Sequence, residues 1–281
     1  MANSSSKIST VYGVDFSGAK LAGENAWVAR LDVGTKKIVA LDRLADLAGD
    51  AARDVALAYL VNAIGESSEA LWAMDFPFAL PIEVVDADSS FDDQLAYLGR
   101  QETDAYQFGR VCVDRALAGG FGMHVRRDTD KETKTPFDCY HYRIVCQMFH
   151  GMRGVLAPLR NVPGTVIPPF DRINGGFDRA VVESCPGSTL KRWGAPHNNY
   201  KQPAGGPLEP KRLKNRRLIL DAIRKHAELD AGTVRKIQRN GGGDALDAVL
   251  AAVGGWESWQ ATDFTEFDRH PRYRREGRIF A

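Results

Sequence analysis

The sequence predicts an α/β fold in which one mixed sheet is covered by helices. Residues 9–44 hold three β-type segments with short connectors, which favours antiparallel neighbours. A helical segment and an apolar strand-like run follow them. After a long interruption, the order of strand, helix and helix returns. Because this alternation runs through the chain, we expect one domain over residues 1–281.

Each predicted element has its own sequence signal. The segments ISTVYGVDF, NAWVARLDV and KIVALDRL are β-type sequences bounded by glycine-containing turns. Residues 50–64 place apolar side chains at helical spacing and end at Gly65. The run ALWAMDFPF is apolar without interruption up to Asp75, as in a buried central strand, and Pro77 then ends the ladder. The order is therefore three strands, a helix and a fourth strand.

Residues 77–176 interrupt this order and are predicted to form a large, mostly helical insertion after the fourth strand. The elements predicted beyond residue 77 are helices over 92–98 and 137–156, a strand over 179–184, and helices over 211–226 and 244–253. The strand over 179–184 brings the sheet to five strands. The charged, aromatic tail 264–281 carries no clear prediction.

Composition sets broad limits on the protein class. The chain has 281 residues, of which 44% are hydrophobic and 26% charged, so a large core can form and disorder of the whole is excluded. No run of about 18 apolar residues is present, and the first residues, MANSSSKIST, lack an apolar signal core. We therefore expect a cytoplasmic protein without a membrane partner. The four cysteines form no CxxC pair, so reduced thiols are expected and a zinc site is not.

Acidic residues stand where predicted strands and a helix meet loops. Asp15 ends the first strand in GVDFSGA, and Asp75 ends the fourth in AMDFP. Asp244 and Asp247 are spaced i, i+3 in GGGDALDAVLAAV, on one face at the start of a helix. If the first and fourth strands are neighbours and this helix crosses their ends, the carboxylates converge. Glu183, at the end of RAVVES, is a further candidate whose alternative role is an ion pair with an arginine.

Converging carboxylates repel one another and require a cation. Their hard oxygen atoms suit Mg²⁺ or Mn²⁺, and a pair of such ions can activate water and stabilise the leaving oxygen of a phosphodiester. We expect Asp15, Asp75 and Asp247 as metal ligands, with Asp244 and Glu183 as further catalytic candidates. Each aspartate also has a structural alternative as a turn former, or, for Asp244, as a helix N-cap.

The element order, GVDFSGA and DALDAVLAAV resemble the RNase H-like superfamily, and the last motif is similar to the terminal helix of RuvC-type Holliday junction resolvases. More closely, nearly the whole chain resembles an uncharacterised family of predicted RNase H-like nucleases. The segments that carry this resemblance are AMDFPFALP, FGRVCVDRAL, VVESCPGSTL, LKNRRLIL and EGRIFA. It implies an RNase H-like sheet and a two-metal nuclease whose acids come from the first strand, the fourth strand and the final helix. These positions correspond to Asp15, Asp75, Asp244 and Asp247, with Asp15 expected to bridge the ions. Asp75 stands where resolvases have glutamate, which leaves the coordination open.

Charge is unevenly distributed along the chain. The total is 37 basic against 36 acidic residues, but residues 41–110 hold 4 against 14 and residues 185–240 hold 13 against 4. The basic segment suits a nucleic-acid backbone. The expected substrate-binding residues are Lys201, Lys211, Arg212, Arg216 and Arg217. The alternative is a solvated helix face. In the loop that follows the 179–184 strand, Lys201 and His197 are also candidates for a transition-state cation or proton donor.

Two other functions stay open at this stage. DFSGAK resembles a phosphate-gripping turn of an actin-like kinase or ATPase, although no second copy of the motif is present. A nucleic-acid-binding module that has lost its chemistry is the other alternative, and it requires carboxylates more than about 8 Å apart or individually salt-bridged. The sequence indicates neither DNA nor RNA, neither endo nor exo cleavage, and no oligomeric state.

Overall fold

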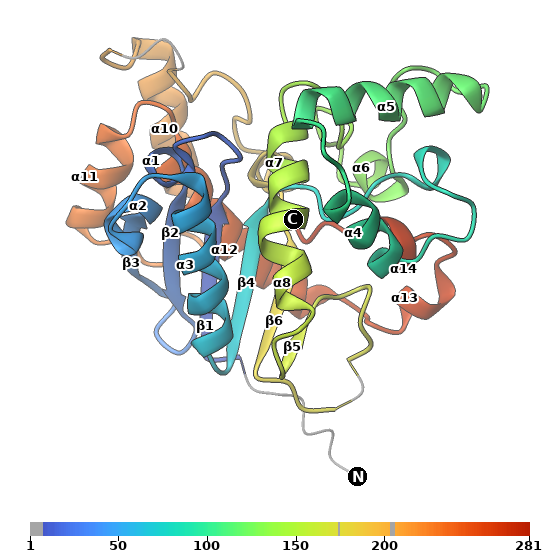
Figure 1. The fold of residues 1–281 in the computed structure, drawn as a ribbon. Coiled ribbons are helices and arrows are strands. Elements are labelled where there is room, and N and C mark those ends of the chain that lie inside the picture. Colours follow the sequence, from blue (N-terminus) through green and yellow to red (C-terminus); the bar gives the residue numbers. More distant parts are fainter. Residues whose placement is uncertain (1–7, 174, 203–205) are drawn as a thin grey trace.

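A mixed six-stranded sheet forms the centre of the protein in the computed structural model, which describes residues 8–173, 175–202 and 206–281. The strand order is β3-β2-β1-β4-β6-β5 (Figure 1). Strands β1, β2 and β3 pair antiparallel, whereas β1–β4, β4–β6 and β6–β5 pair parallel. The strands are β1 (Thr10–Asp15), β2 (Trp27–Asp32), β3 (Lys37–Arg43), β4 (Ala70–Asp75), β5 (Thr165–Val166) and β6 (Arg179–Glu183). The predicted α/β class with one mixed sheet is confirmed.

The sheet has one strand more than the five predicted. The additional β5 has only two residues and lies within residues 77–176, the segment predicted as an insertion. In β5, Thr165 pairs with Arg179 of β6. A strand of two residues is too short to show an alternating pattern, so the sequence does not predict it.

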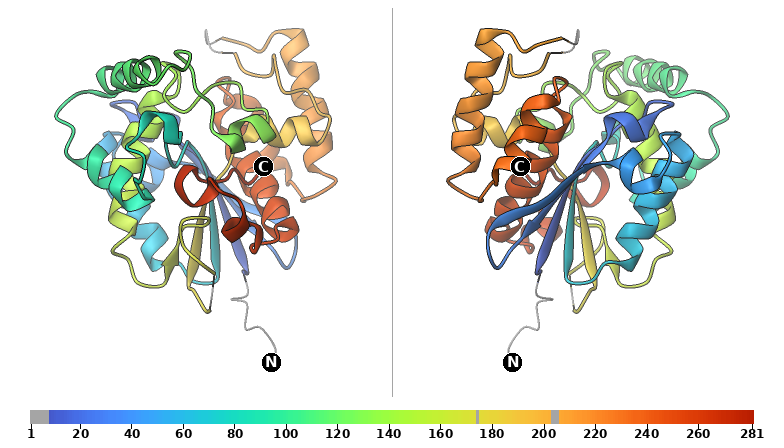
Figure 2. Two further views of the ribbon diagram at one scale, coloured as in Figure 1. Left: turned by 90° about the vertical axis from the view of Figure 1, so that its right-hand side faces the viewer. Right: turned by 90° about the vertical axis from the view of Figure 1, so that its left-hand side faces the viewer.

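Helices cover both faces of the sheet. The longer ones are α3 (Arg53–Glu66), α4 (Phe91–Gly99), α5 (Ala105–Ala118), α10 (Pro210–Ile223), α11 (Ala231–Arg239) and α12 (Asp244–Ala261). The shorter ones are α1 (Ala22–Asn25), α2 (Leu44–Ala48), η1 (Ile82–Val84), α6 (Asp128–Glu132), α7 (Val145–Gly151), η2 (Met152–Leu156), α8 (Ala157–Leu159), α9 (Pro186–Arg192), α13 (Glu266–Arg269) and α14 (Tyr273–Glu276). In Figure 1, α3, α7 and α8 cross one face, and α12 lies behind the sheet. Figure 2 shows the same layers from either side.

The prediction of a helix over 137–156 is wrong in its first half. The chain turns at Asp138, whose carboxylate accepts a hydrogen bond from the Tyr140 backbone N–H at 3.2 Å, so the helix begins only at Val145. Conversely, α5 went unpredicted, although Asp104 caps it by accepting from the N–H groups of Tyr106 and Gln107.

Helix α12 packs directly on the strands of the sheet. A Cβ atom at Gly13 of β1 would stand 2.1 Å from the carbonyl oxygen of Ala248, and one at Gly255 would stand 2.6 Å from Cβ of Ala73 in β4. Alanines and glycines therefore meet across this layer, and the helix backbone lies close to the strand backbone. This close approach places the start of α12 above the ends of β1 and β4.

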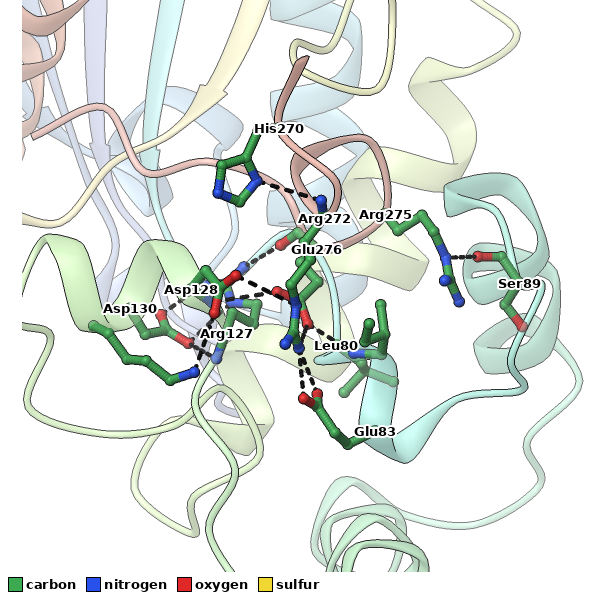
Figure 3. Close-up of polar contacts among 12 residues, drawn as sticks. Leu80, Glu83, Ser89, Arg127, Asp128, Asp130, His270, Arg272, Arg275 and Glu276 are labelled. Atoms are coloured by element: carbon green, nitrogen blue, oxygen red, sulfur yellow. Dashed lines mark hydrogen bonds and ion pairs between the residues drawn. The ribbon is translucent and has the colours of Figure 1, made fainter. Parts of the chain in front are cut away.

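The segment between β4 and β6 is tied to the C-terminal tail by buried charges (Figure 3). Arg127 is fully buried and donates to Asp130 and to the Glu276 carbonyl, while Arg272 pairs with Glu83 at 2.6 Å and with Glu276. Ion pairs of this kind are stable when every buried charge has a partner. Throughout residues 8–173, 175–202 and 206–281, no helix has the length and apolar character needed to span a bilayer.

Replacing Gly13 tests the close packing of α12 on β1. We expect Gly13→Ala to lower the free energy of unfolding by about 1 to 3 kcal/mol, because the added methyl overlaps the α12 backbone. Gly99→Ala is the matched control, since its Cβ meets nothing within 4 Å. Chemical denaturation of both variants measures the difference, and equal stabilities would contradict the packing described here.

Candidate active site

The strand register brings Asp15 and Asp75 together. They are direct partners at the ends of the parallel strands β1 and β4. Because side chains alternate along a strand, Asp15 points to the same face as Gly13, against which α12 packs, and Asp75 points to the same face as Ala73. Asp247, in the first turn of α12, completes the group. Carboxylate oxygens of Asp15, Asp75 and Asp247 lie within 4.8 Å of one another.

The turn before α12 positions Asp247. Gly243 has a φ of 95°, a left-handed conformation that glycine adopts without strain, and Asp247 N–H donates to its carbonyl at 2.9 Å. The Asn240 side chain accepts from the Gly243 and Ala245 N–H groups at 2.8 and 3.2 Å. Asp244 is thus the first helical residue, so its alternative role as the N-cap is wrong, and the Asn240 side chain accepts these hydrogen bonds instead.

Asp244 lies beside the acidic group and outside it. It is half-buried, and its carboxylate accepts a hydrogen bond from the Asn240 amide at 3.2 Å. Its negative charge raises the pKa of the buried Asp247, next to the larger effect of burial itself. Of the two acids predicted from DxxD, the structure therefore brings only Asp247 into the cluster.

Burial disfavours the charged forms of all three acids. It raises the pKa of Asp75 to about 8, with a further contribution from the Asp247 carboxylate. It also raises the pKa of Asp15 well above its usual range and that of Asp247 more moderately. Without a cation, burial therefore favours the neutral, protonated carboxyls, whereas a bound cation would stabilise their negative charge.

One ammonium group partly offsets this charge. Lys201 Nζ forms an ion pair with Asp247, and the Tyr200 hydroxyl donates to the other Asp247 oxygen at 2.9 Å. Burial of the ammonium opposes its charge, but the Asp247 and Asp15 carboxylates outweigh burial and raise the pKa of Lys201 well above its usual value. The site thus holds a permanent positive charge at one edge.

Glu183 lines the same cavity but is not part of the acidic group. It shares a sheet face with Val181, which packs toward the segment after β4, and so points away from α12. Arg127 Nη1 donates to its carboxylate at 2.8 Å, and the Phe78 N–H donates to it at 3.0 Å. Glu183 therefore lies in a buried ion pair, which is the alternative role the sequence analysis assigned to it.

The predicted substrate-binding residues divide into three groups. Arg216 is fully buried and donates to the carbonyls of Tyr200, Ile237, Asn240 and Gly241, so it is structural, and its prediction as a substrate contact is wrong. Lys201 and Arg212 line the acidic cavity. Lys211 and Arg217 are exposed on α10.

The acids open into a cavity of about 490 Å³. Its wall also contains Arg143, Gln147, Ser184 and the exposed His197. Ser184 follows Glu183 in sequence and so returns to the face of the acids. Its hydroxyl is buried and has no hydrogen-bond partner among the described residues. The three carboxylates, within 4.8 Å of one another, supply hard oxygen donors of the kind that a divalent cation binds.

Sequence analysis missed three residues of this region. Tyr200 adjoins Lys201 in the chain, but a hydroxyl contact to Asp247 leaves no pattern. Ser184 can be identified only once it is known that the Glu183 side chain faces away from α12, because neighbouring side chains of a strand lie on opposite faces of the sheet. Arg127 is 56 residues from its partner Glu183, and nothing in its local sequence distinguishes it.

Comparison of the chain with protein-family models, with curated proteins and with solved structures finds no match. Function is therefore argued from the geometry of the site.

The raised pKa of Asp75 predicts a pH-dependent stability of the metal-free protein. A carboxyl with a raised folded pKa stabilises the fold below its unfolded pKa of about 4, and this contribution is lost as the pH rises towards about 8. We expect Asp75→Asn to exceed the wild type in melting temperature by several degrees at pH 8 in EDTA, and to match it near pH 4.

The matched control is Asp114→Asn, an exposed carboxylate on α5. Its melting temperature should follow the wild type at every pH. Melting curves recorded from pH 4 to pH 9 measure this difference. A wild-type protein whose melting temperature rises between pH 6 and pH 8 would contradict the predicted loss of stability.

Removing the Glu183 charge tests its structural role. We expect Glu183→Gln to lower the free energy of unfolding by about 3 to 5 kcal/mol, since Arg127 loses a buried charge partner. Glu66→Gln, a change at a helix end, should have little effect. Urea denaturation measures both, and a folded Glu183→Gln variant of wild-type stability would show that the ion pair is unimportant.

Proposed function

We propose that the protein is a metal-dependent phosphodiester hydrolase that acts on nucleic acid. The observation that carries this proposal is the convergence of Asp15, Asp75 and Asp247 within 4.8 Å at the edge of an open cavity. The three acids come from β1, β4 and α12, the arrangement implied by the resemblance to RNase H-like nucleases. Mg²⁺ or Mn²⁺ are the cations that such an oxygen-only set suits.

The residues present fit a divalent cation. The carboxylates of Asp15, Asp75 and Asp247 would together hold the ion. When bound, the metal lowers the pKa of a coordinated water and offsets charge on the leaving oxygen.

The chain's own residues would orient the substrate. Tyr200 and Lys201 hold Asp247 in place from two sides. The Lys201 ammonium, with Arg143 and Arg212 on the same cavity wall, offers positive charge to a phosphate bound beside the acids. Lys201 thus acts both as a partner of Asp247 and as a candidate contact to the phosphate.

A non-catalytic binding module is the main alternative. It calls for acids more than about 8 Å apart or individually salt-bridged. Of the three acids, only Asp247 forms an ion pair within the part of the chain that the structure describes. The short distances and the absence of an ion pair to Asp15 or Asp75 among the described residues favour catalysis.

Cleavage assays test the proposal. We expect Mn²⁺ or Mg²⁺ to support cleavage of DNA or RNA by the wild type, and Asp15→Asn to lower the rate by at least about 100-fold, because a ligand charge is lost from the metal site. Chelation with EDTA should abolish the activity. The assay follows labelled single-stranded, duplex and branched substrates on gels.

Asp114→Asn serves as the control and should retain the full rate. Equal activity of wild type and Asp15→Asn would point to a contaminating nuclease and refute the site. A thermal shift produced by ATP with Mg²⁺, and absent with Mg²⁺ alone, would instead favour the actin-like kinase or ATPase.

A further inference from the structure

A second cavity, of about 930 Å³, lies on the same side of the sheet as α9 and α10 and plays no part in the acidic cluster. We call it the lysine groove, and define it by the residues that line it. They are Lys134, Lys191, Trp193, Gly194, Ala195, Pro196, His197, Leu218, Asp221, Ala222 and Lys225. Three separate parts of the chain build it: the turn after α6, the end of α9 with its following loop, and α10.

The lysine groove adjoins the acidic cavity. His197 lines both, and Lys134 of the groove immediately precedes Thr135 of the acidic cavity. Helix α9 connects the acidic cavity and the lysine groove. Its first residues, Pro186 and Gly187, line the acidic cavity, and its last turn lines the groove. Seven helical residues extend about 10 Å, which is about the axial length of three nucleotides in a duplex strand.

The charge of the groove is positive. Lys134, Lys191 and Lys225 bring three ammonium groups to it, and Lys191 Nζ donates to the Lys134 carbonyl, which fixes the two segments side by side. Asp221 is the one carboxylate among the lining residues, and it already pairs with Arg224 at 2.8 Å. The positive charge of the lysines is therefore available to an anion.

One wall of the groove is held rigidly. The Trp193 ring stacks on His226 with centroids 4.6 Å apart, and its indole N–H donates to Glu257 at 2.8 Å. On α10, the Asn215 amide donates to the Asn198 and Asn199 carbonyls and fixes the loop between the two cavities. A preformed wall lowers the entropic cost of binding an extended ligand.

We infer that the lysine groove binds the phosphate backbone of a nucleic-acid strand as it leaves the acidic cavity. This inference rests on the proposed function, because it takes the acidic cluster as the point of cleavage. Continuity with that cavity, the three ammonium groups and the exposed Leu218 in the groove lining match a strand with charged phosphates and apolar sugar and base surfaces.

The experiment measures binding of a labelled single strand and a labelled duplex at several salt concentrations. It compares the wild type with the double variant Lys191→Gln/Lys225→Gln, in Ca²⁺ to limit cleavage. We expect the slope of log affinity against log salt to become shallower by about 1.8 for the duplex and about 1.4 for the single strand, since two phosphate contacts are lost. An unchanged slope would show that the lysine groove does not bind the phosphate backbone.

The matched control removes two exposed arginines from elsewhere, Arg30→Gln/Arg100→Gln. Arg30 is on β2 and Arg100 ends α4, and neither lines the groove or the acidic cavity. The control should keep the wild-type slope. If the slope of log affinity against log salt decreased equally in the control, binding would depend on total charge, and the inference of a binding site in the lysine groove would be wrong.

Hydrolysis of a small diester, bis(p-nitrophenyl) phosphate, separates this inference from the proposed function. Such a substrate is too short to reach the groove, so the groove variant should hydrolyse it at the wild-type rate while its KM for a long nucleic acid rises. A wild type that binds nucleic acid through the groove and leaves every diester intact refutes the hydrolase alone. A wild type that cleaves long substrates with the same KM as the groove variant refutes the groove alone.

Discussion

The close approach of α12 to β1 and β4 is the constraint on which the site depends. Gly13 leaves room for the α12 backbone, and Gly255 leaves room for Ala73, so the helix lies against the strands without large side chains between them. The first turn of the helix then stands over the ends of two parallel strands whose last residues are Asp15 and Asp75 in register. A bulkier contact layer would move Asp247 away from the other acids, so small residues far from the cluster determine its geometry.

Such a cluster opposes folding, and the surrounding chain offsets part of that cost. Lys201 and Tyr200 contact Asp247, whereas Asp15 and Asp75 form no ion pair among the described residues, and burial keeps their pKa values raised. Burial also raises the pKa of Glu183, but its carboxylate forms an ion pair with Arg127. The side chains of Asp15 and Asp75 lie on the sheet face that packs against α12, and the side chain of Glu183 lies on the opposite face. The matched acid stabilises the fold, whereas the unmatched acids retain an affinity for a cation.

This difference explains how far the sequence could predict the site. Strand ends and a helix start are local properties, so they identify Asp15, Asp75 and Asp247 as candidates. Their convergence also depends on the pairing of β1 with β4, which the sequence analysis assumed and the structure contains. The same reasoning failed for Glu183, since its face depends on where alternation begins in β6. It also failed for Arg216, because a basic residue on a helix looks solvated until its four carbonyl partners, all distant in sequence, are known. Long-range pairing is what local patterns lack.

Part of the basic charge in the sequence is used inside the fold and is not available for binding. Residues 185–240 carry 13 basic against 4 acidic residues, but part of that excess is internal: Arg216 serves the fold, and Lys236 pairs with Asp42. The lysine groove uses Lys191 and Lys225 of this segment together with Lys134, which lies outside it. Local electrostatic attraction therefore follows from which ammonium groups share a surface and lack carboxylate partners. In a chain of nearly balanced total charge, binding to a polyanion has to depend on such a local surface rather than on net charge.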